Sequence, residues 1–170
     1  MKKFFILLAA CTVGFMNTTN AMTNESIATT VDNDIDEEIF NEVTKLIDQY
    51  ISNMEVFDEA MRDESINKMC DTLAEFDDMT LYEATMSYFF TTLSEEIPGR
   101  GFSMERWDEL YHEIADWKTR LFECETEDHV ENWMIDYATF CSELPKDECT
   151  FATCMMSKFL ANIMDGADEL

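Results

Sequence analysis

The amino-acid sequence predicts an all-α protein, a single bundle of five to seven amphipathic helices. Hydrophobic residues make up 46% of the chain and aromatic residues 12%, so folding can bury enough apolar surface to offset the entropy lost on ordering. Only four Gly and two Pro occur among 170 residues, whereas β-sheet folds need many turns rich in both. Apolar residues also recur at spacings of three and four along most of the chain, which is the helical period.

The first helix is expected from about Ile35 to Ile51. Asp34 can cap its N-terminus, with Glu37 three residues later as the capping-box partner. Its apolar residues fall on one stripe, which we expect to face the core. They are Ile35, Ile39, Val43, Leu46, Ile47, Tyr50 and Met54.

The apolar pattern then changes phase between Phe57 and Ile66. These two residues are nine positions apart, which places them about half a turn out of register at roughly 3.6 residues per turn. Two short helices, or one helix kinked near Asp63, would explain the change.

The following helices have clear start and stop signals. Thr80 to Glu83 forms a capping box, and Pro98 with Gly99 ends the helix that begins there. Ser103 and Thr126 are expected to cap the next two helices.

The last helix is expected to begin near Asp147, after Pro145 has ended the helix before it, and to end at Gly166 in the C′ position. Its apolar residues cover a broad arc, which predicts the central or most buried helix of the bundle. They are Phe151, Ala152, Met155, Met156, Phe159, Leu160, Ile163 and Met164.

The N-terminal residues are typical of a signal peptide. Lys2 and Lys3 precede an apolar stretch from Phe4 to Met16, and small residues follow up to Ala21, where cleavage is expected. This stretch is too short to span a membrane, which takes about 20 apolar residues. We therefore expect an exported protein, periplasmic or secreted, with no membrane span.

Two alternatives for localisation stay open. Leu8 to Cys11 resembles a bacterial lipoprotein box, which would make Cys11 the lipidated residue. The ending Ala167 to Leu170 resembles an endoplasmic-reticulum retention signal, which applies if the source is a eukaryote. The predicted organisation is a signal peptide at 1–21, a flexible N-terminal segment at 22–33, a helical domain at 34–166 and a C-terminal tail at 167–170.

The charge is strongly negative. The chain has 37 acidic and 11 basic residues, for a net charge of −26. Removing residues 1–21 takes away two Lys and no acidic residue, so the net charge of the mature chain becomes −28. Such a surface repels nucleic acid and anionic membranes and attracts cations or a basic protein or peptide.

One helical segment offers candidate metal ligands. His112-Glu113 with Asp116 resembles the zinc-protease signature His-Glu-x-x-His, with Asp in place of the second His. Residues four apart on a helix can face one metal while the Glu activates water. His112 also follows Glu109 in the spacing of half a di-iron motif, but the second half is missing, because Thr126 stands three residues before His129.

A calcium loop is not predicted. Asp32, Asp34 and Asp36 alternate as such a loop requires, but Glu37 and Val43 stand where Gly and Glu are needed. Weak, diffuse calcium binding by the acidic surface stays open, and we predict no cofactor.

Five cysteines remain after signal removal, so at least one is expected without an intramolecular partner. Cys141 and Cys149 flank the turn at Pro145, and a disulfide between them, or between Cys141 and Cys154, is compatible with this geometry. No Cys-x-x-Cys motif supports a thioredoxin-like activity.

The function expected from these observations is that of an exported acidic helical binding protein that is not catalytic. A metal-dependent enzyme using His112, Glu113 and Asp116 is one alternative, and a passive structural or weak cation-binding protein is another. No convergent catalytic side chains, phosphate-binding loop or basic aromatic patch favours an enzyme or a nucleic-acid-binding protein.

Overall fold

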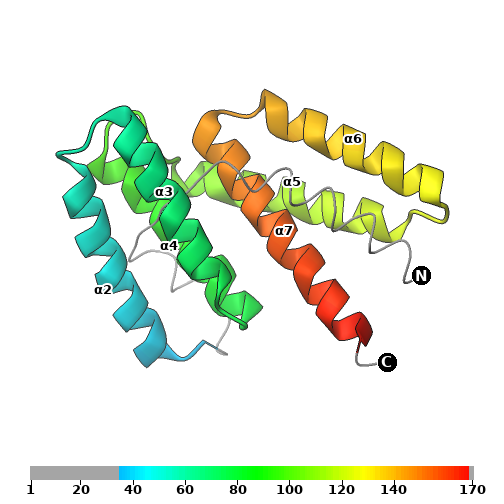
Figure 1. The fold of residues 1–170 in the computed structure, drawn as a ribbon, viewed down its shortest axis with the longest axis horizontal. Helices are drawn as coiled ribbons and strands as arrows, with labels where there is room; N and C mark the ends of the chain where they lie inside the picture. Colours follow the sequence, from blue (N-terminus) through cyan, green and yellow to red (C-terminus); the bar gives the residue numbers. More distant parts are fainter. Residues whose placement is uncertain (1–34, 169–170) are drawn as a thin grey trace. The chain divides into compact units, whose positions relative to one another are not determined.

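The computed structural model describes residues 35–168, which contain six α-helices and no β-strand. The helices are α2 (Glu37–Met54), α3 (Glu59–Ala74), α4 (Met79–Glu96), α5 (Met104–Phe122), α6 (Glu127–Glu143) and α7 (Lys146–Asp168) (Figure 1). The predicted all-α class and the predicted number of helices are confirmed. Among these helices, none has the length and apolar content needed to cross a membrane.

The predicted signal peptide at 1–21 and flexible segment at 22–33 lie outside the described residues. The predicted tail at 167–170 lies partly outside them, and its first two residues belong to α7. The described residues divide into two compact units, which meet in the sequence within α5, between Trp107 and Asp108. We describe each unit by itself.

The first unit contains α2, α3, α4 and the start of α5. Figure 1 shows α2, α3 and α4 as neighbouring helices, and each of the three contacts the other two. The core of this unit includes the aromatic rings of Tyr82, Phe89 and Phe90 on α4, together with Ile47 of α2 and Leu73 of α3. These side chains are almost fully buried, so α4 is held between two apolar helix faces.

Helix α4 is buried on nearly all sides, which the apolar pattern did not predict. Several of its buried residues are small and polar, among them Thr85 and Thr91. Their hydroxyls donate to backbone carbonyls one turn earlier, at 2.7 Å to Leu81 and 3.0 Å to Ser87. A hydroxyl satisfied inside its own helix costs little to bury, so these positions can face the core without being apolar.

The prediction that the last helix is the most buried one is wrong. Phe151, Ala152 and Met155 of α7 are buried as expected. Phe159 and Ile163 are only half-buried, so the C-terminal part of the broad apolar arc keeps contact with solvent.

Two helices begin at a cap other than the predicted one. Asp36, not Asp34, caps α2, and its Oδ1 accepts from the backbone N–H of Glu38 at 3.0 Å. Asp78, not Thr80, caps α4, and its Oδ1 accepts from the backbone N–H of Thr80 at 2.8 Å. At α4 the cap is thus a carboxylate and not the predicted hydroxyl, and a negative charge interacts more favourably with the positive end of the helix dipole.

The other predicted boundaries can be compared directly. Ser103 and Thr126 cap α5 and α6 as predicted, each accepting a backbone N–H at 3.2 Å. Helix α3 runs unbroken from Glu59 to Ala74 and is not the two short helices of one predicted alternative, and Phe57 lies in the connection before it. Gly166 lies within α7 and does not end it.

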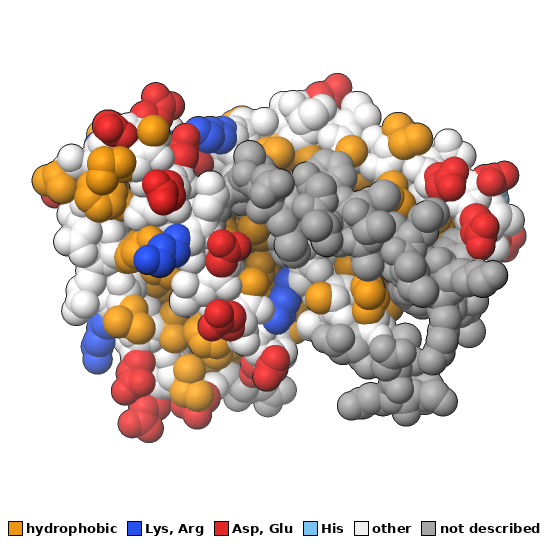
Figure 2. All heavy atoms as spheres, viewed as in Figure 1, with side chains coloured by type: hydrophobic (Ala, Val, Ile, Leu, Met, Phe, Trp, Pro, Cys, Tyr) orange, Lys and Arg blue, Asp and Glu red, His pale blue; other side chains and the backbone are white. Residues whose placement is uncertain are grey.

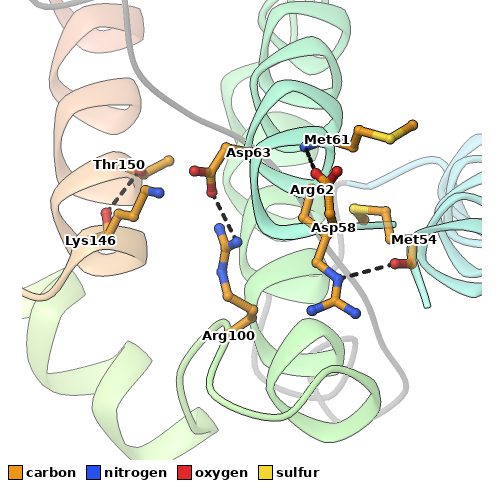
Figure 3. Close-up of polar contacts among 8 residues, drawn as sticks. All are labelled: Met54, Asp58, Met61, Arg62, Asp63, Arg100, Lys146 and Thr150. Atoms are coloured by element: carbon orange, nitrogen blue, oxygen red, sulfur yellow. Dashed lines mark hydrogen bonds and ion pairs between the residues drawn. The ribbon is translucent and has the colours of Figure 1, made fainter. Parts of the chain in front are cut away.

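The connection between α4 and α5 is held against α4. Gly101 has a φ of +65°, and a Cβ placed there would overlap with the carbonyl oxygen of Phe90. The backbone N–H of Phe102 donates to that same oxygen at 3.2 Å, and the two Phe rings stack at 5.1 Å. Arg100 forms an ion pair at 2.9 Å with Asp63 of α3 (Figure 3), which ties the connection to a second helix.

The second unit contains the rest of α5 with α6 and α7. Trp133 of α6 donates its indole N–H to the backbone carbonyl of Trp117 on α5 at 3.0 Å. Tyr137 of α6 stacks on Trp133 at 5.4 Å and donates its hydroxyl to the carbonyl of Ala152 on α7 at 2.7 Å. Helix α6 therefore joins the other two helices through aromatic side chains whose polar atoms are hydrogen-bonded.

Candidate interaction surface

Helix α2 has two apolar faces, and within the described residues one of them is buried while the other is partly exposed. The covered face carries the buried residues of this helix, which are Phe40, Thr44, Ile47, Ile51 and Met54. The second face carries Ile39, Val43, Leu46 and Tyr50, which we name the α2 stripe. At about 100° per residue the two faces are separated by roughly 90° around the helix axis.

Exposure distinguishes the two faces. Ile39 and Leu46 expose 45% and 62% of their surface, and Val43 and Tyr50 are half-buried. The predicted core stripe of this helix was therefore partly wrong. Ile47 and Met54 face the core as expected, whereas Ile39 and Leu46 face solvent, because α3 and α4 cover only one side of a wide apolar arc.

The apolar surface continues past the end of α2. Val56 in the α2–α3 connection is 85% exposed, and Met61 in the first turn of α3 is 49% exposed. Of the six large hydrophobic side chains that are exposed in residues 35–164, four lie between positions 39 and 61. Figure 2 shows hydrophobic side chains at the surface in the region of α2 and α3, with Asp and Glu side chains among them.

Hydrogen bonds hold the segment that carries Val56 and Met61. Asp58 caps α3 by accepting the backbone N–H of Met61 at 2.9 Å. Arg62 donates from Nε to the carbonyl of Met54 at 3.2 Å and from Nη2 to the carbonyl of Glu55 at 3.3 Å. Figure 3 shows Arg62 reaching back from α3 to the end of α2, so the turn is fixed by hydrogen bonds at both of its ends.

The charge around this surface is almost entirely negative. Residues 36–64 include ten acidic side chains and two basic ones, Lys45 and Arg62. Glu38 and Glu42 lie on α2 directly beside the α2 stripe, on the side away from the core, and both are exposed. The surface therefore combines exposed aliphatic side chains with a negative border.

The predicted metal ligands lie on the surface of α5. His112 is 73% exposed in its side chain and contacts Asp108, with Nδ1 2.7 Å from the backbone carbonyl and 3.7 Å from the carboxylate. Glu113 is half-buried and Asp116 is exposed. Within the part of the chain that the structure describes, no three His, Cys, Asp or Glu side chains are grouped so as to hold a metal ion. The structure does not bring the three residues together, and metal binding there stays a sequence-based prediction.

The predicted disulfide is not formed in the structure, where Cys141 and Cys149 are free thiols. Both thiols hydrogen-bond with the side chain of Thr153. Burial raises the pKa of Cys141 from 9.0 to about 11, although hydrogen bonds with Tyr137 and Thr153 lower it. A thiol with so high a pKa is protonated at neutral pH and is a poor nucleophile, and the Cys141–Cys149 pairing stays a prediction.

Val56 and Met61 were missed as surface residues of interest, because Val56 belongs to no helical stripe and Met61 shares a face with Phe57 and Ala60 in the sequence pattern. The signal that identifies them is that they are apolar, out of phase with both neighbouring stripes, and surrounded by Asp and Glu. An apolar residue that fits no core-facing pattern is a candidate for exposure.

No family model matches the chain, and no curated protein or solved structure is significantly similar to it. The fold and surface define an acidic all-α protein with an exposed apolar stripe, and any functional proposal depends on that geometry.

Proposed function

We propose that this protein is an exported, acidic, helical interaction protein that binds a basic protein or peptide and is not itself catalytic. The observation that supports this proposal is the surface formed by residues 36–64. There, exposed Ile, Leu, Val and Met side chains occur together with ten acidic residues and only two basic ones.

The two properties of this surface have different physical consequences. Exposed apolar side chains gathered in one region favour burial against a partner, because removing apolar surface from water stabilises a complex by about 25 cal/mol per Å². The surrounding carboxylates attract cationic partners over a distance of about 8 Å at physiological salt and repel anionic ones. A basic protein or peptide satisfies both conditions, whereas nucleic acid and anionic membranes do not.

Export is part of this proposal and depends on the predicted signal peptide. The expected mature N-terminus follows Ala21, and the alternatives are lipidation at Cys11 or retention in the endoplasmic reticulum. Intact mass and N-terminal sequencing of the protein from its native host distinguish these. A chain that keeps residues 1–21 would contradict export through a cleaved signal peptide.

The binding proposal is tested with two helical peptides of about three heptads each. One has Leu at helical spacings of three and four with Lys at the other positions, and the second has Gln in place of every Lys. Isothermal titration with the mature protein should show binding of the Lys peptide that weakens about tenfold or more between roughly 20 mM and 300 mM salt. Equal binding of the Lys and Gln peptides, or binding of neither, would refute the proposal.

A further inference from the structure

We infer that the α2 stripe is the docking site for one amphipathic basic helix of a partner protein, which lies along α2. This inference rests on the proposed function and adds to it the site and the shape of the ligand. The observations that support it are the spacing of the stripe, its exposure and the charges beside it.

The spacing of the α2 stripe matches that of the apolar residues at the contact between two helices of a coiled coil. Ile39, Val43, Leu46 and Tyr50 are separated by four, three and four residues. This is the alternation by which apolar residues of one helix pack between those of another in a coiled coil. From Ile39 to Tyr50 the stripe is about 16 Å long at roughly 1.5 Å per residue, which is three turns of a partner helix.

Among the described helices, α3 reaches the α2 stripe at Tyr50, and the two aliphatic residues Ile39 and Leu46 stay exposed. The core of this unit is reached by the other face of α2, through Phe40, Ile47 and Ile51. Tyr50 marks the edge between the faces, because its hydroxyl donates to the backbone carbonyl of Ser65 on α3 at 2.9 Å. Ile39 and Leu46 remain exposed by 45% and 62%.

The charges beside the stripe select a cationic helix. Glu38 and Glu42 lie where the flanking residues of a partner helix would pass, and Lys45 is the one basic residue of α2. A partner with Lys or Arg at its flanking positions would pair with these carboxylates. A second copy of this chain would bring a surface with the same excess of acidic over basic residues, and like charges would oppose that dimer.

The inference is tested by removing apolar surface without changing charge. The double variant Ile39→Ala, Leu46→Ala keeps good helix-forming residues and leaves the core face intact. The matched control is Phe122→Ala, Ile135→Ala, which removes two side chains of the other unit that are 71% and 63% exposed. Circular dichroism and urea unfolding of both variants show whether each remains folded.

The probe is the amphipathic Lys peptide, compared with a peptide of the same composition in which the Leu residues are spread evenly around the helix. We expect the Ile39→Ala, Leu46→Ala variant to bind the amphipathic peptide about tenfold or more weakly than the unchanged protein, and the control variant to bind it unchanged. The evenly spread peptide should bind all three proteins weakly and alike.

Two results would overturn the inference, and they differ from failure of the proposed function. If both Lys peptides bind the unchanged protein and the double variant equally, binding is through charge alone and the stripe is not the site, although the proposed function stands. If the unchanged protein is a dimer by sedimentation and the double variant is a monomer, a second copy occupies the stripe. Absence of any preference for Lys over Gln peptides would instead refute the proposed function.

Discussion

Replacement of Gly101 by Ala should destabilise the protein far more than the same replacement at Gly99. Both glycines have a positive φ, +65° at Gly101 and +79° at Gly99. The left-handed conformation therefore destabilises an Ala variant at either position by about 1–2 kcal/mol. The lower entropy of the unfolded Ala variant offsets about 0.4–1 kcal/mol of this at each position. A Cβ at Gly99 would meet nothing within 4 Å, so the expected net loss there is about 1 kcal/mol.

The environment of Gly101 is different. A Cβ at this position would overlap with the carbonyl oxygen of Phe90 and lie 2.6 Å from the backbone nitrogen of Ser94. The backbone of α4 cannot yield, so the connection must move away and lose the hydrogen bond from Phe102 to Phe90, which contributes about 0.5–1.5 kcal/mol. The stacking of the two Phe rings contributes about as much again, so the expected loss for Gly101→Ala is about 3 kcal/mol.

Urea unfolding followed by far-ultraviolet circular dichroism measures both free energies of unfolding. The Gly99→Ala variant is the matched control, since it shares the backbone conformation and lacks the clash. Equal losses for the two variants would refute the account of how the α4–α5 connection packs on α4.

Three further predictions concern stability. Replacing Asp63 by Asn removes the carboxylate that pairs with the guanidinium of Arg100, which is 11% exposed, and should cost about 2 kcal/mol. A double-mutant cycle with Arg100→Met should give a coupling free energy above about 1 kcal/mol, and a coupling near zero would contradict the ion pair. Replacing Tyr137 by Phe removes the hydrogen bond to the Ala152 carbonyl and should lower the free energy of unfolding by about 1 kcal/mol in the same urea assay, whereas no loss would show that the bond is unimportant. The pKa of Cys141 is raised from 9.0 to about 11 in the folded protein, so the stability it contributes is complete below pH 9 and is lost as the pH rises through 11. The midpoint temperature of thermal unfolding should therefore fall less between pH 8 and pH 11 for Cys141→Ala than for the unchanged protein. Equal falls for the two proteins would contradict the raised pKa of Cys141.

The helical class, the number of helices and several boundaries could be predicted from sequence, because they depend on local signals. Ser103 and Thr126 cap their helices through backbone bonds within three residues. The caps of α2 and α4 were misplaced, because an acidic residue lay close to each predicted cap and nothing local decides which oxygen accepts the first N–H groups.

Burial was harder to predict, because it depends on which neighbour covers a face. The apolar arc of α2 spans two faces, and the sequence alone does not say that Ile47 is covered while Leu46 is exposed. In α4, Thr85 and Thr91 are buried although they are polar, and their hydroxyls can be buried at little cost because they are hydrogen-bonded within the helix.

The candidate surface could be predicted only in part for the same reason. The negative charge was evident from composition, but Ile39 and Leu46 were assigned to the core, and Val56 and Met61 were not recognised as exposed. The His112 motif shows that a spacing of four residues does not by itself predict a metal site. Residues four apart on an exposed helix face also need a further ligand that points toward the same ion.

The central claim, that the α2 stripe receives a basic amphipathic helix, is tested most directly by methyl nuclear magnetic resonance during titration with the amphipathic Lys peptide. We expect the methyl signals of Ile39, Val43 and Leu46 to shift together and to saturate at one equivalent of peptide, while the signal of Ile135 stays in place. Shifts spread evenly over exposed methyl groups in both units, or none at the stripe, would contradict the claim.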